Sequence, residues 1–226
     1  MIFCIPLFSK DTGVRINHTE FEGRASFGAN FVEDEPEDDL QGHGTACASM
    51  VAGKRAGVAK KANIVAVKVL NKDGSGMISD VLAGILWTRD QEKGIVSMSL
   101  GGPYNFIINL AVYLTVNSGQ FVAVAAGNEN SDACGTSPAS TATAFTVAAS
   151  NYTNTLAWFS NYGRCVDIIS PGTKCLLANA TTGDFSRASG TSMATPLVAG
   201  VAAIKLAENA TLTPATLSAL ILKHLY

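Results

Sequence analysis

The chain has 226 residues, of which 47% are hydrophobic and 15% are charged, and its formal net charge is −2 at pH 7. This length suits a single domain, and the apolar share is enough to fill a sizeable core. A net charge near zero gives no reason to expect nucleic acid or an anionic membrane surface as a partner. No stretch reaches about 18 consecutive apolar residues, so no transmembrane helix is indicated.

The predicted elements, taken in chain order, alternate between strands and helices. Residues 1–8 are apolar but lack the basic start and small-residue cleavage site of a secretory signal, so we expect them to form the strand leading to Asp11. Continuous apolar, β-branched runs predict further buried strands at residues 63–70, 94–99, 121–126 and 145–149. Helical patterning predicts helices at residues 79–91, with Ser79 as N-cap, and at 106–117, 192–208 and 214–224. This alternation indicates an α/β architecture without internal repeats.

An acidic segment precedes the first histidine motif. Six of the seven residues 33–39 are acidic, with Pro36 between them. We interpret the segment as a solvated surface loop. The alternatives are a cation-binding loop or a field that favours basic substrates. Because the segment ends four residues before His43, it could also raise the pKa of that histidine.

A serine between small residues opens the longest predicted helix. Residues 190–200 read GTSMATPLVAG, which places Ser192 near the helix start. Small neighbours let a substrate approach, and the unpaired N–H groups of a helix N-terminus can stabilise an anion. Ser192 is therefore the candidate nucleophile, and it needs a general base to remove its proton.

Three further polar residues could complete an acyl-transfer site. His43 is the candidate base, because it lies between glycines in GHGT and titrates near neutral pH, whereas a structural role is preferred for His18 and His224. Asp11, in DTG, can orient the imidazole and stabilise its charged form; its alternative is a turn residue. Asn128 follows an apolar run in AAGN and can donate its amide to an oxyanion.

The chain order Asp11, His43, Asn128, Ser192 resembles that of the subtilisin-like serine proteases (subtilases), of the proteinase K type. The segments SMSLGG at 97–102, FSNYG at 159–163 and SPGT at 170–173 are also similar to the family. The resemblance implies a three-layer α/β fold, with a mostly parallel sheet of about seven strands between helices. It implies one catalytic domain over residues 1–226, with Asp11, His43 and Ser192 as the triad and Asn128 as the oxyanion donor.

By the same resemblance, a substrate peptide binds as an extended strand between two backbone segments. The substrate-binding residues are then Gly74, Ser75 and Gly76 on one side, Ser99, Leu100 and Gly101 on the other, and Ala125, Ala126 and Gly127 in the primary pocket. Main-chain pairing gives little side-chain preference. Because residues 100–102 and 125–127 contain no acid, we expect broad cleavage after apolar or aromatic residues rather than basic ones.

The five cysteines leave one without a partner. The resemblance implies a disulfide between Cys134 and Cys165, worth about 3–4 kcal/mol by loop closure. It also implies a free thiol at Cys47, beneath the catalytic site, and it assigns no role to Cys4 or Cys175. A metal site is the alternative for the cysteines, but no pair has the Cys-x-x-Cys spacing.

The resemblance implies a structural calcium ion and no cofactor for the chemistry itself. Asp167 matches a calcium-binding carboxylate, with the carbonyls of Ala142 and Ala144 as partners, and such hard oxygen ligands suit calcium. The alternative is that Asp167 caps a loop. The expected partners are protein or peptide substrates of a monomeric enzyme.

The sequence departs from the family pattern at several positions. Lys10 stands where relatives carry an apolar strand residue, so it is either buried or paired with Asp11 in competition with His43. Ala46, Ser49 and Leu197 replace other residues that are usual in the family. Relatives also carry a propeptide and longer ends, so we expect the chain to be truncated at both ends, without propeptide or signal peptide.

Three functional hypotheses follow. The first is a secreted serine endopeptidase; sequons at Asn17, Asn151, Asn179 and Asn209 and the expected disulfide favour a secreted glycoprotein. The second is an inactive binding module or truncated copy that keeps the fold. This hypothesis becomes stronger if Lys10 displaces Asp11 from His43. The third is a lipase-type hydrolase, which is disfavoured because its motif is Gly-x-Ser-x-Gly with the histidine last.

Overall fold

The computed structural model describes residues 5–223. A seven-stranded sheet forms its centre, in the order β2-β3-β1-β4-β6-β8-β9, and every pair of neighbours is parallel. The strands are β1 (Pro6–Asp11), β2 (Ala25–Asn30), β3 (Asn63–Lys68), β4 (Ile95–Met98), β6 (Phe121–Ala125), β8 (Phe145–Ser150) and β9 (Ile168–Pro171). Two short antiparallel pairs join β5 (Gly102–Pro103) to β7 (Thr136–Ser137) and β10 (Cys175–Ala178) to β11 (Phe185–Ala188).

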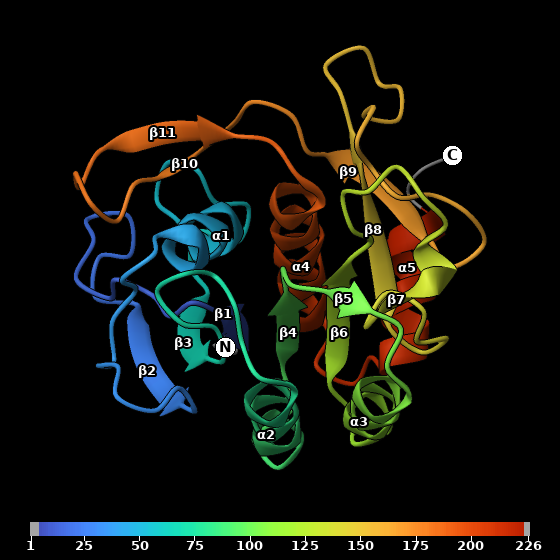
Figure 1. Cartoon of the computed structure of the whole chain (residues 1–226), viewed down its shortest axis with the longest axis horizontal. Coiled ribbons are helices and arrows are strands. Elements are labelled where there is room, and N and C mark those ends of the chain that lie inside the picture. The colour runs from blue at the N-terminus through green and yellow to red at the C-terminus, as the bar shows by residue number, and fades with distance from the viewer. Residues whose placement is uncertain (1–4, 224–226) are drawn as a thin grey trace.

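Five helices cover the two faces of the sheet and complete three layers (Figure 1). One face carries α1 (His43–Ala52), α4 (Thr191–Glu208) and α5 (Pro214–Lys223), and the other carries α2 (Ile78–Arg89) and α3 (Phe106–Asn117), which pack against each other. A single turn of 3-10 helix covers Ala133–Gly135. The α/β fold expected from the sequence is confirmed. Within residues 5–223, no helix is long and apolar enough to cross a membrane.

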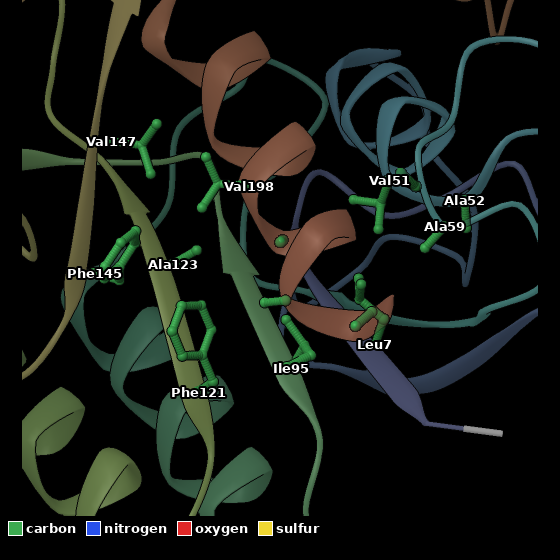
Figure 2. Packing of buried hydrophobic residues seen from close by; sticks show 14 of the residues in the cluster. Leu7, Val51, Ala52, Ala59, Ile95, Phe121, Ala123, Phe145, Val147 and Val198 are labelled. Carbon is green, nitrogen blue, oxygen red and sulfur yellow. The ribbon is translucent and has the colours of Figure 1, made fainter. Parts of the chain in front are cut away.

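The two largest apolar clusters lie on opposite faces of the sheet, because successive side chains of a strand point to opposite faces. On β1, Leu7 packs with Ile95, Phe121 and Val198 in the cluster under α1, α4 and α5 (Figure 2). Its neighbour Phe8 packs in the cluster under α2 and α3. A sheet covered on both faces explains why its central strands read as continuous apolar runs rather than as alternating patterns.

The predicted elements differ from the observed ones mainly at ends and edges. Helix α2 begins at Ile78 with Met77 at the cap position and without a side-chain cap bond, so the prediction of Ser79 as N-cap is wrong. The Ser79 hydroxyl bonds Asp80 instead. The predicted strand at the start of the chain is confirmed from Pro6 onward; residues 1–4, with Cys4, and His224 lie outside the described residues.

The parallel sheet brings the predicted motifs to one edge. β1 ends at Asp11, β4 ends just before Ser99, and β6 ends two residues before Gly127. Helices α1 and α4 begin at the same edge, with His43 and Ser192 in their first turns. In open α/β sheets, ligands bind in the crevice at the carboxyl ends of the strands, which is where these residues gather.

Candidate active site

Asp11 and His43 form a short ion pair at the carboxyl edge of β1. Oδ1 of Asp11 lies 2.7 Å from Nδ1 of His43, and Asp11 is only 1% exposed. The negative charge of Asp11 is the main cause that raises the pKa of His43 above its ordinary value. The acidic segment 33–39 does not cause this shift. Because Nδ1 is engaged, Nε2 is the imidazole nitrogen left to accept a proton.

Glycines let helix α1 approach the Asp11 loop closely. A Cβ on Gly44 would lie 2.0 Å from the carbonyl oxygen of Gly13 and 2.9 Å from Cβ of Asp11, so only glycine fits there. Gly42, at the cap position of α1, has a φ of 102°, which also favours glycine. The GHGT motif therefore reflects a backbone contact that brings His43 to Asp11.

Ser192 lies in the first turn of α4, and its backbone carbonyl is free of the helix because of Pro196. Proline has no N–H, so it cannot donate to the carbonyl four residues before it. The carbonyl of Ser192 instead accepts bonds from Ser99 Oγ at 3.0 Å and Cys47 Sγ at 3.4 Å. The Ser192 hydroxyl donates to the carbonyl of Ser99 at 3.3 Å rather than to His43. A nucleophile–base bond that is long without substrate is common in such sites.

Asn128 is oriented by the start of α4. Its Oδ1 accepts bonds from the N–H of Thr191 at 2.8 Å and the Thr191 hydroxyl at 3.1 Å. Thr191 is fully buried, and its hydroxyl also accepts the N–H of Gly127 at 3.2 Å. Because its oxygen is used in this way, the amide N–H groups of Asn128 are the donors that its side chain can offer to a ligand in the Ser192 pocket.

Two adjoining hollows contain all nine predicted substrate-binding residues. A cleft of about 710 Å³ is lined by His43, by Gly74, Ser75 and Gly76, and by Ser99, Leu100 and Gly101. A pocket of about 320 Å³ is lined by the last three of these and by Ala125, Ala126, Gly127, Asn128 and Ser192. The cleft thus joins the histidine to the two expected backbone segments, and the pocket joins the serine to the amide.

Cys47 packs against the imidazole as a neutral thiol. Its Sγ lies 3.8 Å from both ring nitrogens of His43, and burial raises the pKa of the thiol. Among residues 5–223, Asp11, His43 and Cys47 are the group of donors close enough to share a metal ion. The equal distances place the sulfur beside the ring face, whereas ring nitrogens bind metals in the ring plane. We therefore assign Cys47 no metal role.

Lys10 does not compete for Asp11. Strand alternation places it on the face of Phe8, opposite Asp11, and it is completely buried. Its Nζ has no hydrogen-bond partner among the described residues. Burial in these surroundings lowers the pKa of Lys10 well below its usual value. The expectation that Lys10 is buried is therefore confirmed, and Asp11 remains paired with His43.

The acidic segment is only partly the solvated loop that we expected. Glu33, Asp34 and Glu37 are exposed. Asp39 is 1% exposed, and its carboxylate accepts bonds from Thr12, Gln41, Gly42 and Thr45 around the Asp11–His43 pair. Asp38 pairs with Arg15, and Glu35 pairs with the buried Lys68. The acidic segment thus holds the loop after Asp11 against the start of α1 through the bonds of Asp39.

Sequence reasoning missed two residues beside the pocket. Glu129 lines the pocket with Ser192, so the expectation that its walls carry no acid holds only for the segments it considered. Asn161 is fully buried behind the same loop and bonds the Glu129 carboxylate at 2.7 Å. Asn161 lies within the FSNYG segment, so the signal was present, but its partners are some 30 positions earlier in the chain.

The remaining predicted residues are the cysteines and Asp167. Cys134 and Cys165 form the expected disulfide, and Cys47 and Cys175 are free. The carboxylate of Asp167 accepts the N–H of Thr146 at 2.7 Å, so Asp167 lies beside the start of β8. Ala142 and Ala144 come just before β8 in the chain.

Comparisons with known proteins agree with this geometry. The family model described as the subtilase family matches residues 9–225. Subtilisin-like protease 2 of Pseudogymnoascus destructans is 48% identical over 214 residues, which cover 92% of this chain and 53% of that protein. Subtilisin-like serine protease Pen ch 18 of Penicillium rubens is 44% identical over 222 residues, 92% of this chain and 44% of that protein. The chain thus spans about half the length of these relatives.

A solved structure shows the same fold. The crystal structure of a cold-adapted subtilisin-like serine proteinase superimposes with a TM-score of 0.94 at 42% identity, covering 98% of this chain and 82% of that one. The family match, the sequence relatives and the shared fold all extend over nearly the whole chain. The chain therefore belongs to the subtilase family.

Proposed function

We propose that this chain is the catalytic domain of a secreted serine endopeptidase that hydrolyses peptide bonds through an acyl-enzyme. The observation that carries the proposal is the 2.7 Å contact between Asp11 and His43 at the wall of the cleft. That cleft shares Ser99, Leu100 and Gly101 with the pocket that holds Ser192. A carboxylate, an imidazole and a serine hydroxyl around two adjoining hollows are the parts that acyl transfer needs.

In the proposed mechanism, Ser192 Oγ attacks the carbonyl carbon of the scissile bond while Nε2 of His43 takes its proton. Asp11 keeps the imidazole in the tautomer with its proton on Nδ1 and stabilises the imidazolium. The amide of Asn128 and the N–H of Ser192 stabilise the oxyanion. His43 then gives the proton to the leaving amine, and the C–N bond breaks. Water hydrolyses the acyl-enzyme by the same steps in reverse order.

The substrate is a protein or peptide bound in extended form along the cleft. Backbone segments 74–76 and 99–101 line it, which favours main-chain pairing and broad specificity. The glycine and alanine walls of the pocket suit apolar or aromatic side chains. Glu129 at the same pocket adds a negative charge, which disfavours acidic side chains there. A peptide library varied at the residue before the cut tests this preference.

Calcium remains a proposal for Asp167. Its carboxylate has one backbone donor, Thr146, and burial raises its pKa. Among the described residues, no lysine or arginine pairs with it. Asp167 is nevertheless exposed, and a carboxylate without a cationic partner is free to bind a hard cation. We expect calcium to raise the melting temperature, and Asp167→Asn to abolish the increase. An equal increase in the variant would remove the site from consideration.

The test of the enzymatic proposal is labelling with a fluorophosphonate probe. We expect the folded chain to be labelled, Ser192→Ala to lose the label, and Ser186→Ala, on β11, to keep it. Cleavage of a casein substrate should follow the same order. A folded chain that takes no label and cleaves no peptide would instead support an inactive binding module.

A further inference from the structure

Asn161 is a fully buried amide behind the loop that carries Asn128. Its Oδ1 accepts the N–H groups of Glu129 and Ser131, each at 3.0 Å. Its Nδ2 donates to the carbonyl of Ala126 at 2.9 Å and to Oε2 of Glu129 at 2.7 Å. Both amide protons and the amide oxygen are therefore used on one loop.

These contacts lie on both sides of Asn128. Ala126 comes two residues before Asn128, and Glu129 comes directly after it. The backbone N–H of Asn161 also donates to the carbonyl of Gly127 at 3.0 Å. Asn161 thus bonds the residues before and after Asn128, but it lines neither the cleft nor the pocket.

The loop needs such a support because its backbone is irregular. Gly127 has a φ of 104° and Asn130 a φ of 50°, so neither can belong to a regular helix or strand. A Cβ on Gly127 would lie 2.3 Å from Nδ2 of Asn161, which shows how closely the amide packs against the loop. Asn128 itself is exposed, and within residues 5–223 its side chain is held through Oδ1 by Thr191 alone.

We propose that Asn161 is a positioning residue for the oxyanion donor, which it serves by fixing residues 126–131 so that the amide of Asn128 meets the developing charge. This inference rests on the proposed peptidase function. A misplacement of about 1 Å in a catalytic group can cost about 100-fold in rate. An amide that bonds Ala126, Glu129 and Ser131 on both sides of Asn128 is placed to prevent such a shift.

The test compares kcat, measured per active site, among variants of the full chain. Fluorophosphonate titration counts the active sites, so misfolded molecules do not enter the value. We expect Asn161→Leu to lower kcat by about 10- to 100-fold with little change in KM. Asn161→Leu must unfold cooperatively to count as folded. If it does not, the same kcat comparison is made with Asn161→Ser, whose side chain is smaller and keeps a hydroxyl. Asn151→Leu is the matched control, because the Asn151 side chain bonds only Thr153 and Thr155 of its own exposed turn and lines neither the cleft nor the pocket.

A second measurement separates positioning from general structural support. In the Asn128→Ala variant the amide of residue 128 is already absent. Replacing Asn161 in that variant should therefore lower kcat further by a factor of less than about three. An equal loss in both backgrounds, or an unchanged kcat in the single variant, would overturn the proposal. Failure of the wild-type chain to take the label would overturn the proposed function itself, which is a separate and earlier outcome.

Discussion

At the scale of single residues, the buried carboxylate of Asp11 sets the working range of His43. The base must be neutral to accept the Ser192 proton, so activity rises with pH through the pKa of His43. Because Asp11 raises that pKa, the rise should lie above the ordinary value of 6.5. Asp11→Asn should move the rise to lower pH and reduce kcat by about 10⁴-fold, since the tautomer is no longer fixed.

Profiles of kcat/KM against pH for both forms test this prediction, and an identical rise in Asp11→Asn would contradict it.

The raised pKa of His43 also affects the stability of the fold. A histidine whose pKa is raised by folding contributes stability that is fully present below its unfolded pKa and is lost as pH rises through the folded pKa. The raised pKa of His43 therefore stabilises the fold most below pH 6.5, where the protonated imidazole cannot serve as the proposed base.

Lys10 has the opposite effect. Folding removes its amine from water without a partner, so the folded state binds fewer protons than the unfolded state between the lowered pKa and the usual one. Stability should therefore rise with pH across that window. Lys10→Met, which keeps the shape of the side chain, should raise the free energy of unfolding at pH 7 by about 1–3 kcal/mol.

Urea unfolding of wild type and Lys10→Met at pH 7 and pH 9.5 measures this effect. The difference in free energy of unfolding between the two proteins should decrease at the higher pH, where the Lys10 amine of the unfolded state begins to lose its proton. A less stable variant, or a stability difference that does not depend on pH, would be inconsistent with a buried lysine whose amine lacks a partner and has a lowered pKa.

At the scale of elements, the contact between helix α1 and the end of β1 assembles the base with its carboxylate. Gly44→Ala would place a methyl group 2.0 Å from the carbonyl oxygen of Gly13, so the helix must move away. We expect kcat/KM to fall by at least about 100-fold. Gly135→Ala is the control, because a Cβ there meets nothing within 4 Å. Equal activity in the two variants would show that α1 tolerates the shift.

The elements also show what sequence reasoning can reach. β3, β4, β6 and β8 are central and apolar, so their patterns predict them. β2 (ASFGAN) and β9 (IISP) lie at the two edges of the sheet, are less apolar or very short, and escaped prediction. The difference is physical, because an edge strand needs neither two apolar faces nor a long run.

The same contrast holds within the site. The motifs around Asp11, His43, Asn128 and Ser192 are readable because each needs small residues where backbones meet. The role of Asn161 depends on partners some 30 positions away, and that of Asp39 depends on how the β1 loop meets α1. The bond between Asp39 and Thr12 and the bonds of Asn161 each join residues that are distant in sequence, so only the folded chain reveals them.

At the scale of the whole molecule, the disulfide between Cys134 and Cys165 closes a loop of 31 residues. Removing it by the double change Cys134→Ser and Cys165→Ser should lower the free energy of unfolding by about 3–4 kcal/mol, because the unfolded chain gains entropy. Cys175→Ser, which removes a free thiol, should have little effect. Urea unfolding compares the three proteins. Equal stability of the double variant and wild type would mean that the loop is already held by its other bonds.

The order of the strands governs when the catalytic parts can meet during synthesis. β1 lies between β3 and β4, which follow it by some 50 and 85 residues, and the serine arrives only with α4. A growing polypeptide therefore carries Asp11 first, and Ser192 follows only after β1 to β11 have been made. Under the proposed function, the triad cannot assemble before this point, so vectorial translation itself delays self-digestion.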